Sequence, residues 1–138
     1  MNPLKEKLAE SLVVFDGAIG TEIYRRNFFV NASYEQLNLT APAVITEIHK
    51  SYLDAGAEVL TTNTFNANAR RLAKFGLADQ TAEINRAGVR LARAVAGENA
   101  LVAGSIGPVG EPESPADTRS RPDLLAAQIA ALSEAGFV

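Results

Sequence analysis

The residues best suited to chemistry stand at the end of an apolar run near the start of the chain. Asp16 directly follows Leu12–Phe15, and Gly17 and Gly20 come next. A short, β-branched run without alternation is typical of a strand that is buried on both faces. A carboxylate at the C-terminal end of such a strand lies where α/β enzymes bind their ligands, and glycine lets the backbone pass close to a bound group. We therefore expect this turn to be part of a binding site.

Two later apolar runs also end in small or polar residues. The run at 58–65 ends in Thr-Thr-Asn-Thr-Phe, and Leu101–Ala103 is followed by Gly-Ser-Ile-Gly-Pro. Hydroxyl and amide side chains supply hydrogen-bond donors and acceptors without bulk, so Asn63, Thr64 and Ser105 are candidates to line a pocket. The alternative is that these positions only serve strand-end and helix-capping bonds. The sequence leaves both interpretations open.

Neither glycine-rich turn matches a nucleotide-binding motif. GSIGPVG at 104–110 lacks the spacing of a dinucleotide fingerprint, and it leads into a proline-containing loop instead of a helix. No lysine follows DGAIGT at 16–21, as a phosphate-binding P-loop would require.

The composition excludes several functional classes. The 138 residues carry a net charge of −3 and no basic cluster, so neither nucleic acid nor a membrane is expected as a partner. Without cysteine, these residues contain no disulfide, thiolate metal site or thiol nucleophile. The only histidine, His49, has no second nitrogen ligand and is interpreted as structural or solvated. With no signal peptide or apolar run of ~20 residues, a cytoplasmic protein is expected.

Helical patterns lie between the apolar runs. Capping residues and prolines predict helices that begin near Asn2-Pro3, Thr40, Asp79 and Ser120, and a short helix capped by Asn66 or Asn68. The first helix is expected to cover one end of the core, and the last to bury Leu125, Ile129 and Leu132. Residues 24–39 are expected to be irregular. The loop Glu111–Ser120 is interpreted as mobile or lid-like.

The alternation of strand and helix signals predicts the fold class, which is α/β. Strands begin near Leu12, Glu58, Leu101 and Phe137, and repeated β–α units require a parallel sheet with right-handed crossovers. Polar or glycine-rich strand ends favour a (β/α)8 barrel with its site at that face. Such a barrel needs about 250 residues. Residues 1–138 are therefore expected to be a barrel domain truncated at the C-terminus, with three βα units and the start of a fourth strand.

Several motifs together resemble the N-terminal half of homocysteine S-methyltransferases. They are DGAIGT, EQLNLTAPAVITEIHKSYLDAGAEVLTTNTFNAN, INRAGVRLAR and VAGSIGPVG, in this order along nearly the whole chain. The family includes the homocysteine domain of cobalamin-dependent methionine synthase, betaine–homocysteine methyltransferase and bifunctional enzymes joined to a methylenetetrahydrofolate reductase. The sequence departs from the family's pattern at Ile19, at Ala32-Ser33 and at Thr61, where glutamate or glutamine often stands.

The resemblance implies methyl transfer to the thiolate of homocysteine, held on zinc. In the family, three cysteines on later barrel strands bind the metal, so no zinc is expected on this chain. The residues of this chain match the part of the family's site that binds the amino acid, which lies opposite the metal. By resemblance, Asp16 attracts the substrate ammonium, and the backbone N–H groups around Gly17 and Ala18 suit its carboxylate. Asn63, Thr64 and Ser105 would line the pocket.

Three functional hypotheses follow. The first is the N-terminal part of a homocysteine methyltransferase, inactive alone. The second is a non-catalytic half-barrel that associates with a separate C-terminal half or with itself. The third is another barrel enzyme that uses Asp16 as an acid or base without zinc. An incomplete barrel leaves open strand edges and uncovered apolar side chains, and we therefore expect self-association through those edges.

Overall fold

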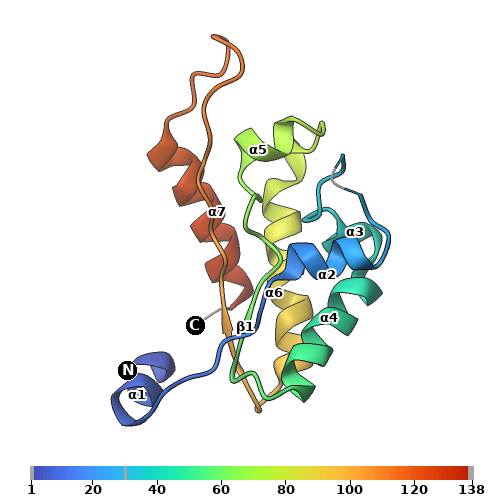
Figure 1. The fold of residues 1–138 in the computed structure, drawn as a ribbon. Helices are drawn as coiled ribbons and strands as arrows, with labels where there is room; N and C mark the ends of the chain where they lie inside the picture. Colours follow the sequence, from blue (N-terminus) through green and yellow to red (C-terminus); the bar gives the residue numbers. More distant parts are fainter. Residues whose placement is uncertain (1, 30, 137–138) are drawn as a thin grey trace.

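Two short parallel strands form the centre of the structure (Figure 1). The computed structural model describes residues 2–29 and 31–136, and the fold is mixed α/β. β1 (Val59–Thr61) pairs with β2 (Leu101–Ala103), Val59 lying opposite Leu101. The helices are α1 (Pro3–Glu10), α2 (Ile19–Arg25), α3 (Leu37–Thr40), α4 (Pro42–Asp54), α5 (Ala69–Ala73), the 3-10 turn η1 (Ala78–Gln80), α6 (Thr81–Ala96) and α7 (Arg121–Ala135). Across the described ranges, no helix combines the length and apolarity needed to span a membrane. The predicted fourth strand at 137–138 lies outside the described residues.

The first apolar run lies beside β1, on the edge opposite β2. Phe15 forms a parallel bridge with Val59, and the N–H of Asp16 donates to the Val59 carbonyl at 2.9 Å. The predicted parallel alignment of the three runs is confirmed, although the first forms one bridge instead of a regular strand. Because the three runs are parallel, their carboxyl ends lie at the same end of the sheet.

The expectation that Leu12–Phe15 is buried on both faces is wrong for this structure. Leu12 is 93% exposed and Val14 is 55% exposed. Helix α1, which was expected to cover one end of the core, buries no residue. Within the described part of the chain, the run pairs only with β1, so its side chains lack the neighbours that a complete sheet provides.

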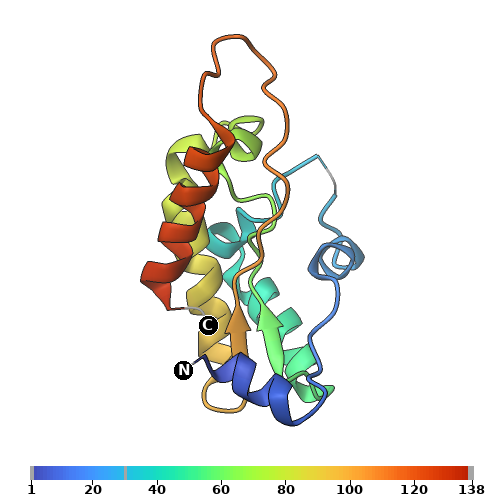
Figure 2. The same cartoon turned by 90° about the vertical axis from the view of Figure 1, so that its left-hand side faces the viewer.

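Helices α4 and α6 support the strands. α6 packs against both strands and α4 packs against β1, and Figure 2 shows β1 and β2 in front of these helices. Leu60 and Val102 of the strands are fully buried in one cluster with Ala92 and Ala96 of α6. Because small alanine side chains let the helix approach closely, the strand ends are held in fixed positions.

The predicted helix starts at Asn2 and Ser120 are confirmed, and of the two candidates Asn66 and Asn68 it is Asn68 that caps α5. Helix α6 begins at Thr81, two residues after the predicted Asp79, and has no side-chain cap. The side chains of Asn2, Asn68 and Ser120 accept backbone N–H groups at the starts of α1, α5 and α7. Thr40, in contrast, is the last residue of α3. Helix α4 begins after Ala41 and has no side-chain cap, since the preceding residues are already helical.

The segment 24–39 is less irregular than predicted, because it includes the end of α2 and most of α3. Ile23 of α2 and Leu37 of α3 are buried against Ile45 and Ile48 of α4. Helices this short are not stable on their own, and burial of their apolar residues stabilises them. Sequence periodicity does not reveal such short elements.

The buried face of α7 is rotated relative to the prediction. Leu132 is buried as predicted, but Ile129 is 45% exposed, and Leu124 and Gln128 are buried in addition. The amide of Gln128 donates to the backbone carbonyl of Thr64 at 2.7 Å, so a polar residue occupies the centre of the inner face. An apolar pattern alone places this face one position off.

The loop after β2 is fixed to α5, which argues against a freely moving lid. Arg70 is only 5% exposed, and its guanidinium donates to the Asp117 carboxylate at 2.8 Å. The same side chain donates to the carbonyls of Gly110 at 3.0 Å and Arg119 at 2.6 Å. One buried arginine therefore holds both ends of the loop.

Candidate functional site

Asp16 lies at the end of the first apolar run, and Thr61 fixes its carboxylate. One oxygen accepts the Thr61 N–H and the other accepts the Thr61 hydroxyl, each at 2.9 Å. Partial burial raises the pKa of Asp16 above its ordinary value, and the bonds from Thr61 oppose that rise. Each carboxylate oxygen can accept a second bond. The side chain is thus oriented by the end of β1 and can still bind a cationic group.

The turn after Asp16 is held by Tyr52 of α4. The Tyr52 hydroxyl donates to the Ala18 carbonyl at 2.8 Å. A Cβ at Gly17 would lie 2.8 Å from the Tyr52 ring, so only glycine fits at this contact. Within the described chain, the N–H groups of Gly17 and Ala18 have no acceptor. Both are therefore available to an anionic group.

A pocket of about 230 Å³ opens at the carboxyl ends of the strands. Asn63, Thr64 and Ser105, three of the predicted site residues, line it. Asp16, Gly17 and Ala18 are not among its lining residues. Thr61 links the two groups, because it lines the pocket and also binds Asp16. The remaining lining residues are Ile19, Gly20, Tyr34, Glu35, Thr62, Phe65 and Asn66.

Two of the polar side chains that line this pocket also donate hydrogen bonds to other parts of its wall. The Asn63 amide donates to the Tyr34 carbonyl at 2.9 Å and to the Asn38 side chain at 3.1 Å. The Thr64 hydroxyl donates to the Ser105 carbonyl at 2.7 Å. Both interpretations left open by the sequence therefore apply, since these residues line the pocket while their donors hold its wall together.

Three buried side-chain amides fix the backbone of residues 63–67, and sequence reasoning missed all three. They come from α3, α6 and α7 and each donates to a carbonyl of this loop. The bonds run from Asn38 to Asn63 at 2.8 Å, from Asn85 to Ala67 at 2.7 Å and from Gln128 to Thr64 at 2.7 Å. The available signal was an isolated amide residue next to an apolar helix face, which hydrophobic periodicity ignores.

Gly88 of α6 allows the same loop to lie against the helix. A Cβ at this position would lie 2.7 Å from a methyl carbon of Thr64 and 2.9 Å from the Asn38 amide nitrogen. These distances are too short for a real contact, so a larger residue would displace the loop. Gly88 therefore permits this close approach.

The described residues do not fit a thiolate zinc site. Across residues 2–29 and 31–136, no group of three potential ligand side chains converges on a point. The chain has no cysteine. His49 is fully buried in α4, where neither ring nitrogen has a hydrogen-bond partner and desolvation lowers its pKa to about 4. His49 is a core residue, as the structural interpretation predicted.

The amino-acid sequence matches a protein-family model. The model described as homocysteine S-methyltransferase matches residues 13–135. Methionine synthase from Mycobacterium leprae is 35% identical over 117 residues, and that of Mycobacterium tuberculosis is 33% identical over the same length. Each alignment covers 76% of this chain and 10% of the relative.

Solved structures show the same relationship. The homocysteine methyltransferase MmuM from Escherichia coli, in its oxidized and metallated forms, superposes with a TM-score of 0.78 and 28% identity. The superposition covers 99% of this chain and 55% of that enzyme. The chain thus spans about half the length of that structure and a tenth of the methionine synthases. Because the family model covers most of its length, the chain belongs to the homocysteine S-methyltransferase family.

Proposed function

We propose that this chain supplies the amino-acid-binding wall of an enzyme that transfers a methyl group to homocysteine and forms methionine. Membership of the family supports the reaction. The observation that carries the assignment is the Asp16 carboxylate, which Thr61 holds at the carboxyl end of β1 beside a pocket.

Each predicted site residue has a role in this proposal. Asp16 binds the ammonium of homocysteine through a charge-assisted hydrogen bond. The free N–H groups of Gly17 and Ala18 bind its carboxylate. The side chain of the substrate then extends toward the pocket lined by Asn63, Thr64 and Ser105.

The reaction forms one bond and breaks one. Homocysteine first loses its thiol proton to solvent. The thiolate sulfur then forms a bond to the methyl carbon, the bond from that carbon to the donor breaks, and its electron pair stays with the donor. The wall binds and orients the substrate for this step. Because these residues lack thiolate ligands for zinc, we expect the chain alone to form no methionine.

We further infer that residues 1–138 are part of one (β/α) barrel domain. Their likeness to 55% of the Escherichia coli enzyme and their three parallel runs support this proposal. The remaining units, with the zinc ligands, would come from another stretch of polypeptide.

A second candidate function is a non-catalytic half-barrel that pairs with a separate half or with itself. The exposure of Leu12 and Val14 favours this alternative, since apolar side chains at an open edge recruit partners. Both candidates share the same fold. They differ in whether the strand-end pocket binds homocysteine.

Titration of the ¹⁵N-labelled chain with L-homocysteine tests the proposed function. We expect the amide signals of Gly17 and Ala18 to shift most, because these N–H groups would bind the substrate carboxylate. 4-Mercaptobutanoate, which is homocysteine without its amino group, is the matched control ligand and should bind more weakly. Shifts absent from residues 16–18, or equal for both ligands, would contradict the proposal.

A further inference from the structure

Tyr52 contacts the turn that the proposed function assigns to the substrate carboxylate. It lies near the end of α4, and its hydroxyl donates to the Ala18 carbonyl at 2.8 Å. A Cβ at Gly17 would lie 2.8 Å from the same hydroxyl oxygen and 2.8 Å from a ring carbon. One side chain therefore touches both residues whose N–H groups are available to an anion.

The ring of Tyr52 is anchored in the core. It packs against two buried clusters, one formed mainly by the strands and α6 and the other by α2, α3 and α4. The residue is half-buried, and its hydroxyl bond lies at the surface. A side chain packed between two clusters keeps one rotamer, because a close-packed interior leaves no room for the others. Tyr52 thus fixes the turn relative to the core.

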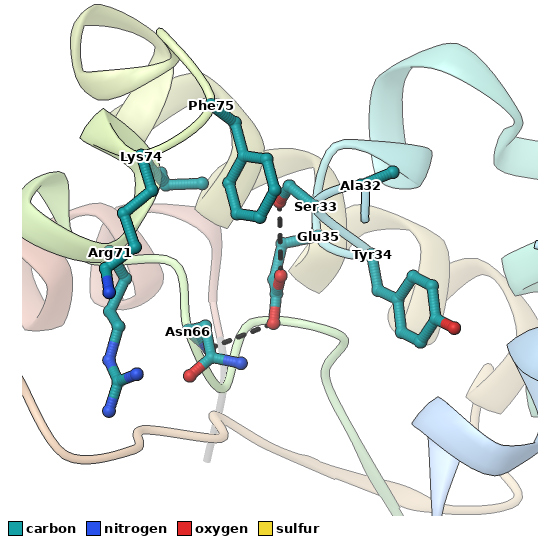
Figure 3. Close-up of a pocket in the computed structure, with 9 residues that line it drawn as sticks. Ala32, Ser33, Tyr34, Glu35, Asn66, Arg71, Lys74 and Phe75 are labelled. Carbon is teal, nitrogen blue, oxygen red and sulfur yellow. Dashed lines mark hydrogen bonds between the residues drawn. The ribbon is translucent and has the colours of Figure 1, made fainter. Parts of the chain in front are cut away.

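Other side-chain restraints on the turn are few. Another wall of the strand-end pocket is held by several side-chain bonds, among them those that Glu35 accepts from Ser33 and from the Asn66 N–H (dashed in Figure 3). In the described part of the chain, by contrast, only Tyr52 hydrogen-bonds to residues 17–18 through its side chain. The helix that follows, α2, has no side-chain cap. The position of the turn therefore depends on Tyr52.

The surroundings of Tyr52 keep its hydroxyl protonated. Burial raises the pKa of Tyr52 above the ordinary value, and the carboxylates of Glu22 and Asp16 raise it further. The opposing charges of Arg25 and Arg26 do not cancel this rise. A neutral phenol donates its proton to a carbonyl, whereas a phenolate has no proton to donate. The hydroxyl therefore remains a donor at neutral pH.

We propose that Tyr52 is a positioning residue for the substrate carboxylate. Its hydroxyl and ring hold Gly17 and Ala18 in place, so their N–H groups need no ordering when the carboxylate binds. The restraint on the turn follows from the contacts alone, whereas its part in binding homocysteine rests on the proposed function. Removal of the hydroxyl weakens recognition of the carboxylate and spares recognition of the ammonium by Asp16.

Nuclear spin relaxation of the ¹⁵N-labelled, ligand-free chain tests the restraint. Tyr52→Phe keeps the packed ring and removes the hydroxyl bond. The order parameters of the Gly17 and Ala18 amides should therefore fall from about 0.85 toward about 0.6. Ser51→Ala and Ser33→Ala are the controls, because each removes a hydroxyl bond outside the turn. Unchanged order parameters at both amides in Tyr52→Phe would overturn the inference.

Two ligands separate recognition of the carboxylate from recognition of the ammonium. L-Homocysteine carries both groups, and 3-amino-1-propanethiol is the same molecule without the carboxylate. The ratio of their affinities, measured by calorimetric titration, should fall about fivefold in Tyr52→Phe and stay unchanged in the two serine variants. Asp16→Asn should weaken both ligands and preserve the ratio, because both carry the ammonium. If Tyr52→Phe weakens both ligands equally, or neither, Tyr52 does not position the carboxylate.

The two experiments distinguish this inference from the proposed function. If the parent chain binds neither ligand, the proposed function fails, and the relaxation data still decide whether Tyr52 holds the turn. Thermal melts check that each variant folds. Should Tyr52→Phe not fold, the parent chain decides. Its Gly17 and Ala18 amides should be as rigid as those of α4, and mobility equal to that of the exposed loop residues 113–116 would overturn the inference.

Discussion

The carboxylate of Asp16 and residue Thr61 are joined by two hydrogen bonds of 2.9 Å, one to the backbone N–H and one to the hydroxyl. Thr61 stands at the end of β1, so the strand itself orients the acid.

Thr61→Val should raise the pKa of Asp16 further. The substitution keeps the shape and the backbone bond but removes the hydroxyl bond, which opposes the effect of burial on this pKa. Following the Asp16 carboxyl carbon by NMR during a pH titration measures the change. Thr46→Val, on α4, is the matched control and should leave the Asp16 pKa unchanged. A lower or equal pKa in Thr61→Val would show that the hydroxyl does not stabilise the carboxylate.

Gly17→Ala should destabilise the chain because its Cβ would overlap the Tyr52 ring at 2.8 Å. Overpacking of this kind costs about 1–3 kcal/mol of unfolding free energy. Gly20→Ala is the control, since the nearest atom would be 3.9 Å away and the site is helical. Urea unfolding of both variants makes the comparison. Equal stabilities would mean that the turn moves away from Tyr52 without cost.

His49 should make the chain less stable in mild acid. The unfolded histidine titrates near 6.5, whereas burial lowers its pKa to about 4 in the folded chain. Between these values the unfolded state binds a proton that the folded state excludes, so the unfolding free energy falls as pH drops from 6.5 toward 4. The loss attributable to this group is at most about 3 kcal/mol.

Comparison with His49→Leu isolates this effect from the carboxyl groups. The variant keeps a buried apolar side chain and removes two ring nitrogens that lack hydrogen-bond partners. Unfolding free energies at pH 7 and pH 4.5 should differ less for the variant than for the parent chain. Identical pH dependence in both proteins would mean that His49 becomes protonated without unfolding.

Much of the fold follows from local signals. The strand Leu101–Ala103 and the caps Asn2 and Ser120 were predicted at the correct residues, and Asn68 was one of two candidate caps, because short-range chemistry determines these features. The burial of Leu12–Phe15 was not, because burial depends on neighbours far along the chain or outside it.

The candidate site was predictable only in part. The position of Asp16 after an apolar run identified the strand end. The role of Thr61 and of the three buried amides was missed, because each acts through a contact at least 18 residues away in sequence. Gln128 illustrates the problem, since its polarity argues against the burial that its bond to Thr64 makes possible.

Self-association through the first apolar run stays a prediction. Leu12→Lys places a charge on the open edge and should shift the chain toward monomer in sedimentation velocity experiments. Leu8→Lys, on α1 and 55% exposed, is the control away from that edge. A parent chain that is monomeric at all concentrations, with a sharp thermal transition, would show that the open edge needs no partner.

Binding of L-homocysteine by the parent chain and by Asp16→Asn tests the central claim most directly. The two side chains have nearly the same shape, and only the first is charged. NMR titration should detect binding to the parent chain, with an affinity at least tenfold higher than for the variant, whereas Asp54→Asn on the exposed end of α4 should match the parent. Equal binding by all three proteins, or none by the parent, would contradict the assignment of Asp16 to the substrate ammonium.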